Sequence, residues 1–288
     1  VIYSSRQQAK YQEYLAEVAT EEAAAAEAAG PEVEKAQSIE QADTTAAVDR
    51  DVEIFGASLA AARDRAAETV TISNDYLTVE FSTAGASMHK VTLAEYTKYA
   101  PREERNEKVV LYEPAPSHMA LEFYIRNGLN NVPVNTSEYV FTNEGVTRGD
   151  GFQKLTMRLD VAPESYLLYE YVLYDEKMPS RDYLLDFDIK LVNMAQLMAN
   201  QSTVNLLWTA RTYQNERGYQ NENMYTTVSY RFPGEESIES LSTGDGEKQE
   251  TVQNAVNWVA FKQQFFSEAL IALSLIHISE PTSRTPIS

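Results

Sequence analysis

The three histidines are the first residues to test for chemistry, because most metal sites and activated serine nucleophiles need at least one. His89 lies in the stretch Ser-Met-His-Lys-Val, His118 follows a proline-rich turn, and His277 lies near the C-terminal end. The chain contains no cysteine, which excludes thiol catalysis and cysteine–zinc sites. We therefore predict that His89 and His118 are surface residues and that the chain has no catalytic residue, no metal site and no cofactor.

A pair of carboxylates is the next candidate. Asp186 and Asp188 project from one face of a predicted strand. Because no third acidic partner or turn glycine lies at the spacing of a calcium loop, we interpret the pair as a solvated face. Gly149-Asp150-Gly151 and Gly244-Asp245-Gly246 are hairpin turn signals, and neither has the strand-to-helix context of a phosphate-binding loop.

The segment Gln214–Tyr225 mixes amide side chains with tyrosines, as a carbohydrate or peptide cleft does. Tyr213, Tyr219 and Tyr225 are the candidate ligand-binding residues of this loop. A polar loop without a ligand is the other interpretation, and the sequence leaves both open.

The charge of the chain excludes one class of partner. Lys and Arg number 24 and Asp and Glu number 43, a net charge of −19 that repels the phosphate backbone of nucleic acids. The longest apolar run, Ala269 to Ile278, is far shorter than the roughly 20 residues that span a bilayer. Since the chain begins without Met and shows no signal peptide, we expect a soluble fragment of a longer protein.

The elements that must position these residues are short strands. In Tyr76–Ser82 the side chains of Leu77, Val79 and Phe81 fall on one face, and Tyr183–Val192 alternates in the same way. Further strands are predicted over Ser87–Leu93, Lys108–Tyr112, Met119–Tyr124, Glu138–Thr142, Phe152–Leu159, Tyr166–Leu173, Thr203–Thr209, Tyr225–Phe232 and Val256–Phe261. Such a series, with little helical pattern between the strands, predicts a mainly β, antiparallel two-sheet fold.

The N-terminal quarter of the chain has a different pattern. Arg6–Ala29 is rich in Ala, Glu and Gln with a helical apolar spacing, which predicts a short amphipathic helix. Gly30-Pro31 ends this pattern, and the polar stretch to Glu68 predicts a linker. We therefore divide the chain into a helix and low-complexity linker over 1–68, a β-domain over 69–272 and a separate tail over 273–288.

The stretch Val256–Ala272 concentrates aromatic side chains near the C-terminal end of the sequence. Its aromatic residues are interrupted by polar ones, which must reach water or a partner. Aromatic clusters are most often core, so the residues by themselves predict an element that closes the β-domain. The members of the group are Trp258, Phe261, Lys262, Gln263, Gln264, Phe265 and Phe266.

The run Trp-Val-Ala-Phe-Lys-Gln-Gln-Phe-Phe over 258–266 resembles the segment that ends the large periplasmic domain of YidC-type membrane protein insertases of Bacteroidetes. Thr71–Ala86 is similar to the first hairpin of that family, although this pattern also occurs in other mutarotase-like β-domains. The resemblance implies a β-supersandwich of the galactose mutarotase type, preceded by a juxtamembrane tether.

The resemblance also implies a function. A YidC-type insertase supports the insertion and folding of inner-membrane proteins, so the implied role is that of a chaperone-like, non-enzymatic domain on the periplasmic side of the inner membrane. Sec translocon subunits and nascent membrane proteins are the implied partners, and the transmembrane insertase core is expected to lie outside this sequence. The aromatic and polar residues of 258–266 are expected to couple the β-domain to the membrane helices.

Two other interpretations stay open. A secreted carbohydrate-binding or epimerase-like domain would use the same fold, although neither His89 nor His118 lies in an epimerase-like histidine motif. A structural surface protein would leave the resemblance at Trp258–Phe266 unexplained. The tail over 273–288 resembles translated sequencing-adapter read-through, and we exclude it from the expected fold.

Overall fold

The structure is a computed structural model that describes most of the chain from residue 50 onward. The described ranges are 50–99, 106–112, 118–175, 181–198, 201, 203–211, 213–241, 252 and 254–273. The predicted helix over 6–29, the predicted linker up to residue 49, the second Gly-Asp-Gly turn and the tail from residue 274 lie outside these ranges. From Asp51 onward, the described residues belong to one contact-defined unit.

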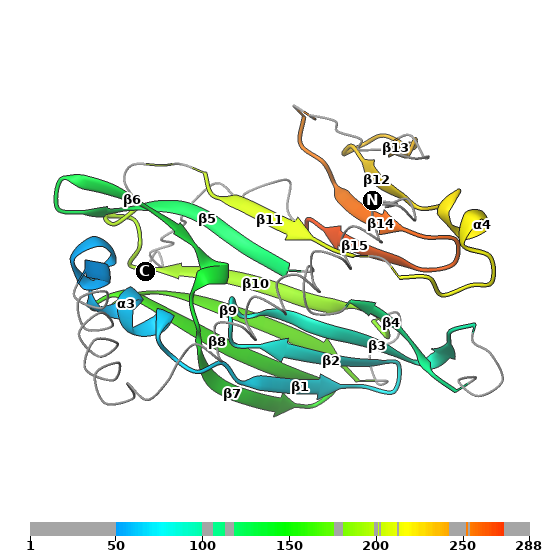
Figure 1. The fold of residues 1–288 in the computed structure, drawn as a ribbon, viewed down its shortest axis with the longest axis horizontal. Helices are drawn as coiled ribbons and strands as arrows, with labels where there is room; N and C mark the ends of the chain where they lie inside the picture. The colour runs from blue at the N-terminus through cyan, green and yellow to red at the C-terminus, as the bar shows by residue number, and fades with distance from the viewer. Residues whose placement is uncertain are drawn as a thin grey trace, which may run out of the picture. The chain divides into compact units, whose positions relative to one another are not determined.

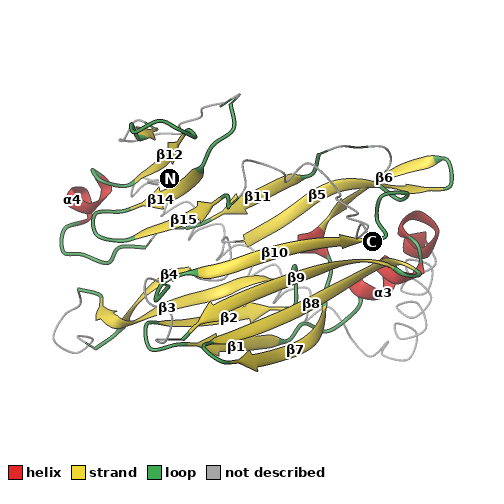
Figure 2. Cartoon of the chain, turned by 180° about the vertical axis from the view of Figure 1, so that it is seen from behind, coloured by secondary structure: helices red, strands yellow, loops and turns green. Residues whose placement is uncertain are grey.

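Strands dominate the described residues, where they form four antiparallel sheets (Figure 1 and Figure 2). The first sheet has the order β1 (Thr69–Ser73), β2 (Leu77–Ser82), β3 (Ser87–Thr97) and β4 (Lys108–Tyr112). The second has the order β10 (Leu185–Val192), β9 (Ser165–Tyr174), β8 (Phe152–Ala162) and β7 (Thr142–Gly149). The predicted mainly β, antiparallel fold is confirmed.

The two remaining sheets are smaller or more irregular. The third has the order β11 (Asn205–Thr209), β5 (His118–Asn127) and β6 (Asn130–Asn135). The fourth has the order β13 (Glu239–Ser240), β12 (Thr227–Arg231), β14 (Trp258–Lys262) and β15 (Ser267–Ile271). Three short helical elements accompany the sheets: α3 (Ala57–Arg63) precedes β1, the 3₁₀ turn η2 (Thr136–Glu138) follows β6, and α4 (Tyr219–Asn223) lies between β11 and β12.

The β2 strand shows how the alternating pattern produces the core. Leu77, Val79 and Phe81 are 5%, 1% and 0% exposed, whereas the residues between them are partly exposed. The turn after β2 contains Gly85 with a φ of 68°, and a Cβ there would lie 3.1 Å from the Cα of Ser137. Glycine is therefore required on both conformational and steric grounds.

The main core joins the first sheet to the second through aromatic side chains. The rings of Phe81 and Tyr171 lie 4.5 Å apart, and Tyr171 stacks on Phe187 at 4.5 Å. The Tyr171 hydroxyl donates a hydrogen bond of 2.7 Å to the Ala86 carbonyl, so its only polar group is satisfied. Complete burial raises the pKa of Tyr171 well above its ordinary value.

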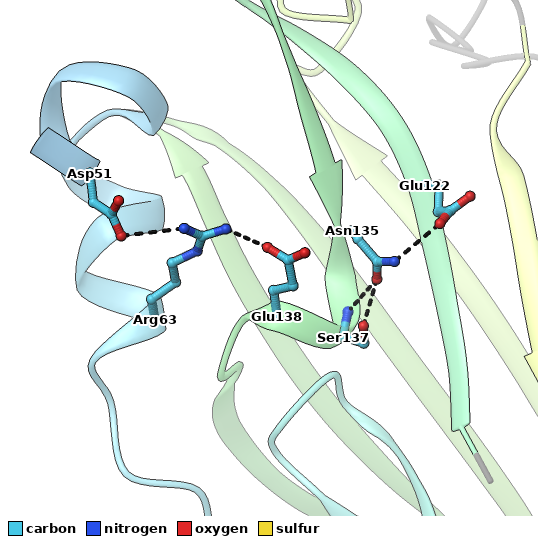
Figure 3. A network of polar contacts seen from close by, with 6 residues as sticks. All are labelled: Asp51, Arg63, Glu122, Asn135, Ser137 and Glu138. Atoms are coloured by element: carbon cyan, nitrogen blue, oxygen red, sulfur yellow. Dashed lines mark hydrogen bonds and ion pairs between the residues drawn. The ribbon is translucent and has the colours of Figure 1, made fainter. Parts of the chain in front are cut away.

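The segment between β6 and β7 corrects one predicted strand. The prediction of a strand over Glu138–Thr142 is wrong, because η2 occupies its start and Val140 makes only an isolated bridge to Ala84. Asn135 causes the turn: its side-chain oxygen accepts hydrogen bonds from the Ser137 amide at 3.0 Å and the Ser137 hydroxyl at 2.6 Å (Figure 3). A side chain that satisfies a nearby amide in this way competes with strand pairing.

Helix α3 lies inside the segment predicted to be a polar linker. Leu59 is 0% exposed, and the Ala62 carbonyl accepts a hydrogen bond of 2.8 Å from the Val140 amide. Arg63 forms ion pairs with Asp51, at 3.3 Å, and with Glu138 of η2 (Figure 3). The packed structure therefore begins before Thr69, which the alanine-rich composition of this segment concealed.

Candidate functional site

The predicted coupling residues lie on one hairpin, formed by β14 and β15. Strand β14 is central in the fourth sheet, since it pairs with β12 on one side and with β15 on the other. In the β14–β15 register, Trp258 lies opposite Ile271 and Phe261 opposite Glu268. Figure 1 shows this hairpin in orange and red, beside α4. We call the residues from Trp258 to Ile271 the C-terminal hairpin.

A tight turn determines which residues the hairpin presents. The Gln263 amide donates a hydrogen bond of 2.8 Å to the Phe266 carbonyl, which leaves Gln264 and Phe265 at the tip. Phe265 is 67% exposed as a consequence. A large aromatic side chain at the tip of a hairpin contributes nothing to the core, so it is available for contact with a partner.

The prediction that this aromatic group is a core element holds only in part, since three of its four aromatic side chains are partly buried and Phe265 is exposed. Of its seven members, only Gln263 is buried, at 7% exposure, and Trp258 is partly buried. Phe261 packs edge-on against Trp208 with ring centroids 4.6 Å apart, and Phe266 packs edge-on against Tyr96 at 5.6 Å. The hairpin is therefore attached to the body through Phe261 and Phe266, while its tip stays exposed.

The buried Gln263 connects the hairpin to the predicted ligand loop. Its side-chain amide donates a hydrogen bond of 2.6 Å to the Tyr213 carbonyl and accepts one of 3.2 Å from the Asn215 side chain. Asn215, at 3% exposure, also donates from its side chain to the Tyr213 carbonyl at 3.2 Å. Two stretches that the sequence indicated separately are thus joined by buried polar groups.

Glu222 of α4 completes this polar network. Its carboxylate, at 4% exposure, accepts hydrogen bonds of 3.1 and 3.2 Å from the Asn215 amide. At the surface of the same contact, the Asn221 side chain donates to the Gln264 side chain at 3.3 Å. A satisfied network of this kind fixes a loop in one conformation, because each broken bond would leave a buried polar group unpaired.

The structure describes the side chains of two of the three tyrosines of the predicted ligand loop. Tyr213 contributes its carbonyl to the polar network, and Tyr225 is 45% exposed. The side chain of Tyr219 lies outside the described residues. A ligand at this loop stays a prediction.

A cavity of about 780 Å³ lies between the C-terminal hairpin and the sheets. Its walls are mainly apolar and come from the first sheet, from β9 and β10, from β11 and from β15. A volume of this size falls in the range of about 300–1,000 Å³ typical of small-molecule sites. The sequence analysis missed this cavity, because its lining residues come from strands far apart in the chain.

Among the described residues, Glu268 and Glu216 are the two carboxylic acids that line this cavity together with the apolar residues. Burial raises the pKa of the Glu268 carboxyl to about 8. Across the cavity, burial and the nearby Glu268 raise the pKa of the Tyr112 hydroxyl, which donates to the Thr209 carbonyl at 3.4 Å. The sequence contains a signal for the position of Glu268. Phe266, Glu268 and Leu270 alternate with more exposed residues, as side chains on the inward face of a strand do.

The other polar candidates of the sequence are two aspartates and two histidines, and the structure does not join them in one site within the described residues. Asp186 accepts hydrogen bonds of 2.6 Å from the Tyr174 hydroxyl and 2.9 Å from Arg181, whereas Asp188 is exposed. His89 lies on β3 and His118 on β5, in different sheets. Within the described residues, no group of three or more His, Cys, Asp or Glu could hold a metal ion.

By its fold and site, the protein is an antiparallel β-sheet domain that presents an aromatic hairpin next to an apolar cavity. Among the helices of the described ranges, none has the length and apolar composition to cross a membrane. The family model of the YidC periplasmic domain matches residues 69–276. The chain therefore belongs to the YidC periplasmic domain family, as the resemblance at Trp258–Phe266 predicted.

Curated relatives agree with this assignment. Over 228 residues, 79% of this chain and 34% of the relative, the sequence is 28% identical to the membrane protein insertase YidC of Porphyromonas gingivalis strain ATCC 33277. Over 203 residues, 70% of this chain and 30% of the relative, it is 29% identical to the membrane protein insertase YidC of Bacteroides fragilis strain ATCC 25285. The chain thus spans about a third of the length of these relatives.

Proposed function

We propose that this chain is the periplasmic part of a membrane protein insertase of the inner membrane. In this role it supports the insertion and folding of membrane proteins without catalysing a covalent reaction. The observation that carries the proposal is the match of residues 69–276 to the YidC periplasmic domain. The insertion step itself belongs to the part of the relatives that this chain does not span.

The C-terminal hairpin is the docking surface in this proposal. Phe265 provides an exposed aromatic side chain, and the polar network around Gln263 holds the hairpin tip in one conformation. A fixed aromatic side chain loses little conformational entropy on binding, so it suits an anchor in a protein interface. Sec translocon subunits are the proposed partner, and nascent membrane proteins are the proposed clients.

A site-specific photo-crosslink tests the docking surface. Purified chain with Phe265 replaced by p-benzoylphenylalanine is mixed with proteoliposomes that contain purified Sec translocon subunits. We expect a crosslink to a translocon subunit from position 265. The matched control carries the same probe at Leu129, which is fully exposed in the β5–β6 turn at the opposite end of the described structure from the hairpin tip (Figure 1).

The control decides the interpretation. Equal crosslinking from positions 265 and 129 would show non-specific contact and would contradict docking through the hairpin. No crosslink from either position would contradict a translocon partner, while leaving the family assignment unchanged.

A further inference from the structure

The cavity behind the C-terminal hairpin contains an unusual combination of groups. Glu268 lies on β15, lines the cavity together with mainly apolar residues and is partly exposed, and no described residue forms an ion pair or hydrogen bond with it. A carboxyl group without a partner in apolar surroundings is unfavourable when ionised, so such a group calls for an explanation.

The charge of the lining indicates what the cavity can accept. The other titratable residues that line it are Tyr96, Tyr112, Tyr171, Tyr183 and Glu216, and no Lys, Arg or His of the described residues does so. Two carboxyl groups without a cation favour a positively charged group and disfavour an anion. The net charge of −19 acts in the same direction at longer range.

The shape and composition of the lining indicate the rest of the ligand. Most of the wall is formed by Leu, Val, Met and aromatic side chains, including Met88, Met119 and Leu270. Met side chains adapt to an irregular or flexible apolar group. The rim carries Phe265 and Tyr96, which are 67% and 45% exposed and can contact a ligand as it enters.

We propose that the cavity binds a single-chain amphiphile with an ammonium head group, whose alkyl chain lies among the apolar side chains and whose ammonium ion pairs with Glu268. This site lies behind the hairpin tip and shares Phe265 with the docking surface, but its ion pair is formed by Glu268, so ligand binding does not require the proposed partner. The amphiphile supplies the cation that the described lining lacks, and its chain fills space that would otherwise remain an open apolar cavity.

Binding of this ligand depends on pH in a defined direction. Only the ionised carboxyl pairs with the ammonium group, and the pKa of Glu268 is about 8. The ionised fraction therefore rises from about one hundredth at pH 6 to about half at pH 8, and the apparent affinity rises with it. The ammonium group keeps its charge over this range because its pKa is near that of lysine, about 10.

Calorimetric titration of the whole chain with decylammonium, below its critical micelle concentration, tests the proposal. We expect binding that strengthens by more than about tenfold between pH 6 and pH 8. Decanol, the neutral probe, is expected to bind more weakly and without this pH dependence. Decanoate is expected not to bind, because its charge has the same sign as that of Glu268 and Glu216.

Glu268→Gln is the decisive variant, because it retains shape and hydrogen-bonding capacity but cannot ionise. We expect it to weaken decylammonium binding at pH 8 by about tenfold or more and to leave decanol binding unchanged. The matched control is Glu239→Gln, an exposed carboxyl on β13 of the same sheet that does not line the cavity. It is expected to bind decylammonium like the unchanged chain.

Four results would overturn the proposal. Equal affinity for decylammonium and decanol, or equal binding by the Glu268→Gln variant, would show that the cavity recognises the alkyl chain and not the ammonium group. No binding of either probe would show that the cavity takes no amphiphile. Tighter binding of an apolar peptide with one lysine than of decylammonium would assign the cavity to a polypeptide segment instead. A thermal melt of each variant at pH 7 establishes that it is folded.

Discussion

The core between β2 and β9 and the region around the C-terminal hairpin are built from the same residue types in different ways. In the core, Phe81 and Tyr171 are closely packed, and the Tyr171 hydroxyl is satisfied by a carbonyl. Around the hairpin, aromatic side chains are partly exposed, a cavity of about 780 Å³ remains, and Glu268 has no partner among the described residues. The difference separates the part of the molecule that provides stability from the part that can bind.

The largest expected effect is the loss of a core aromatic side chain. Phe81→Ala removes a ring that is 0% exposed, so we expect it to lower the free energy of unfolding by about 3–5 kcal/mol. Trp258→Ala removes a larger side chain that is only partly buried, and we expect about 1–2 kcal/mol. Urea denaturation of both variants measures the comparison, and equal losses would contradict it.

The second effect is a dependence of stability on pH over the range in which Glu268 of the hairpin region titrates. The pKa of Glu268 is about 8 in the folded chain against 4.5 for a free side chain, so the native state holds more protons between these values. Stability from this group is therefore full below pH 4.5 and falls as pH rises towards 8, by at most about 1.4 kcal/mol per pH unit.

The Glu268→Gln variant measures this contribution. Because the carboxyl is only partly buried and can be hydrated, we expect the variant to be more stable than the unchanged chain by about 2 kcal/mol at pH 9. At pH 4 the two should be equally stable, because the carboxyl is then neutral in both states. A constant difference across this range would show that Glu268 is not desolvated.

The smallest expected effect distinguishes the two adjacent glutamines of the hairpin. Gln263→Ala breaks two hydrogen bonds of a buried network, and we expect a loss of about 1–2 kcal/mol. Gln264→Ala removes an exposed contact at 3.3 Å to Asn221, and we expect less than about 0.5 kcal/mol. Thermal melts compare the pair, and a larger loss for Gln264→Ala would contradict the proposed network.

Much of the fold could be predicted because local alternation determines it. The predicted Lys108–Tyr112 strand matches β4 at both ends, and the Gly149-Asp150-Gly151 signal falls at the β7–β8 turn. The pattern of Leu77, Val79 and Phe81 predicted their burial for the same reason. These features depend on side-chain period and turn chemistry, which a single sequence contains.

The rest depends on contacts between distant residues. Strand β6 was missed because Asn130–Asn135 contains a proline and three asparagines, which are rare in strands. At the candidate site, the hairpin residues were predicted as a group, but their partial exposure was not. The link between Gln263 and Asn215 spans 48 residues, and no local pattern indicates it.

Helix α3 also affects where the folded domain should be cut for expression. The family match starts at residue 69, yet Leu59 and Ala62 are buried and Arg63 pairs with Glu138, 75 residues further along the chain. A protein that starts at Thr69 would leave the Val140 amide without its acceptor and uncover the apolar surface beneath α3. The boundary of the evolutionary family and that of the folding unit therefore differ, and the folding unit begins near Asp51.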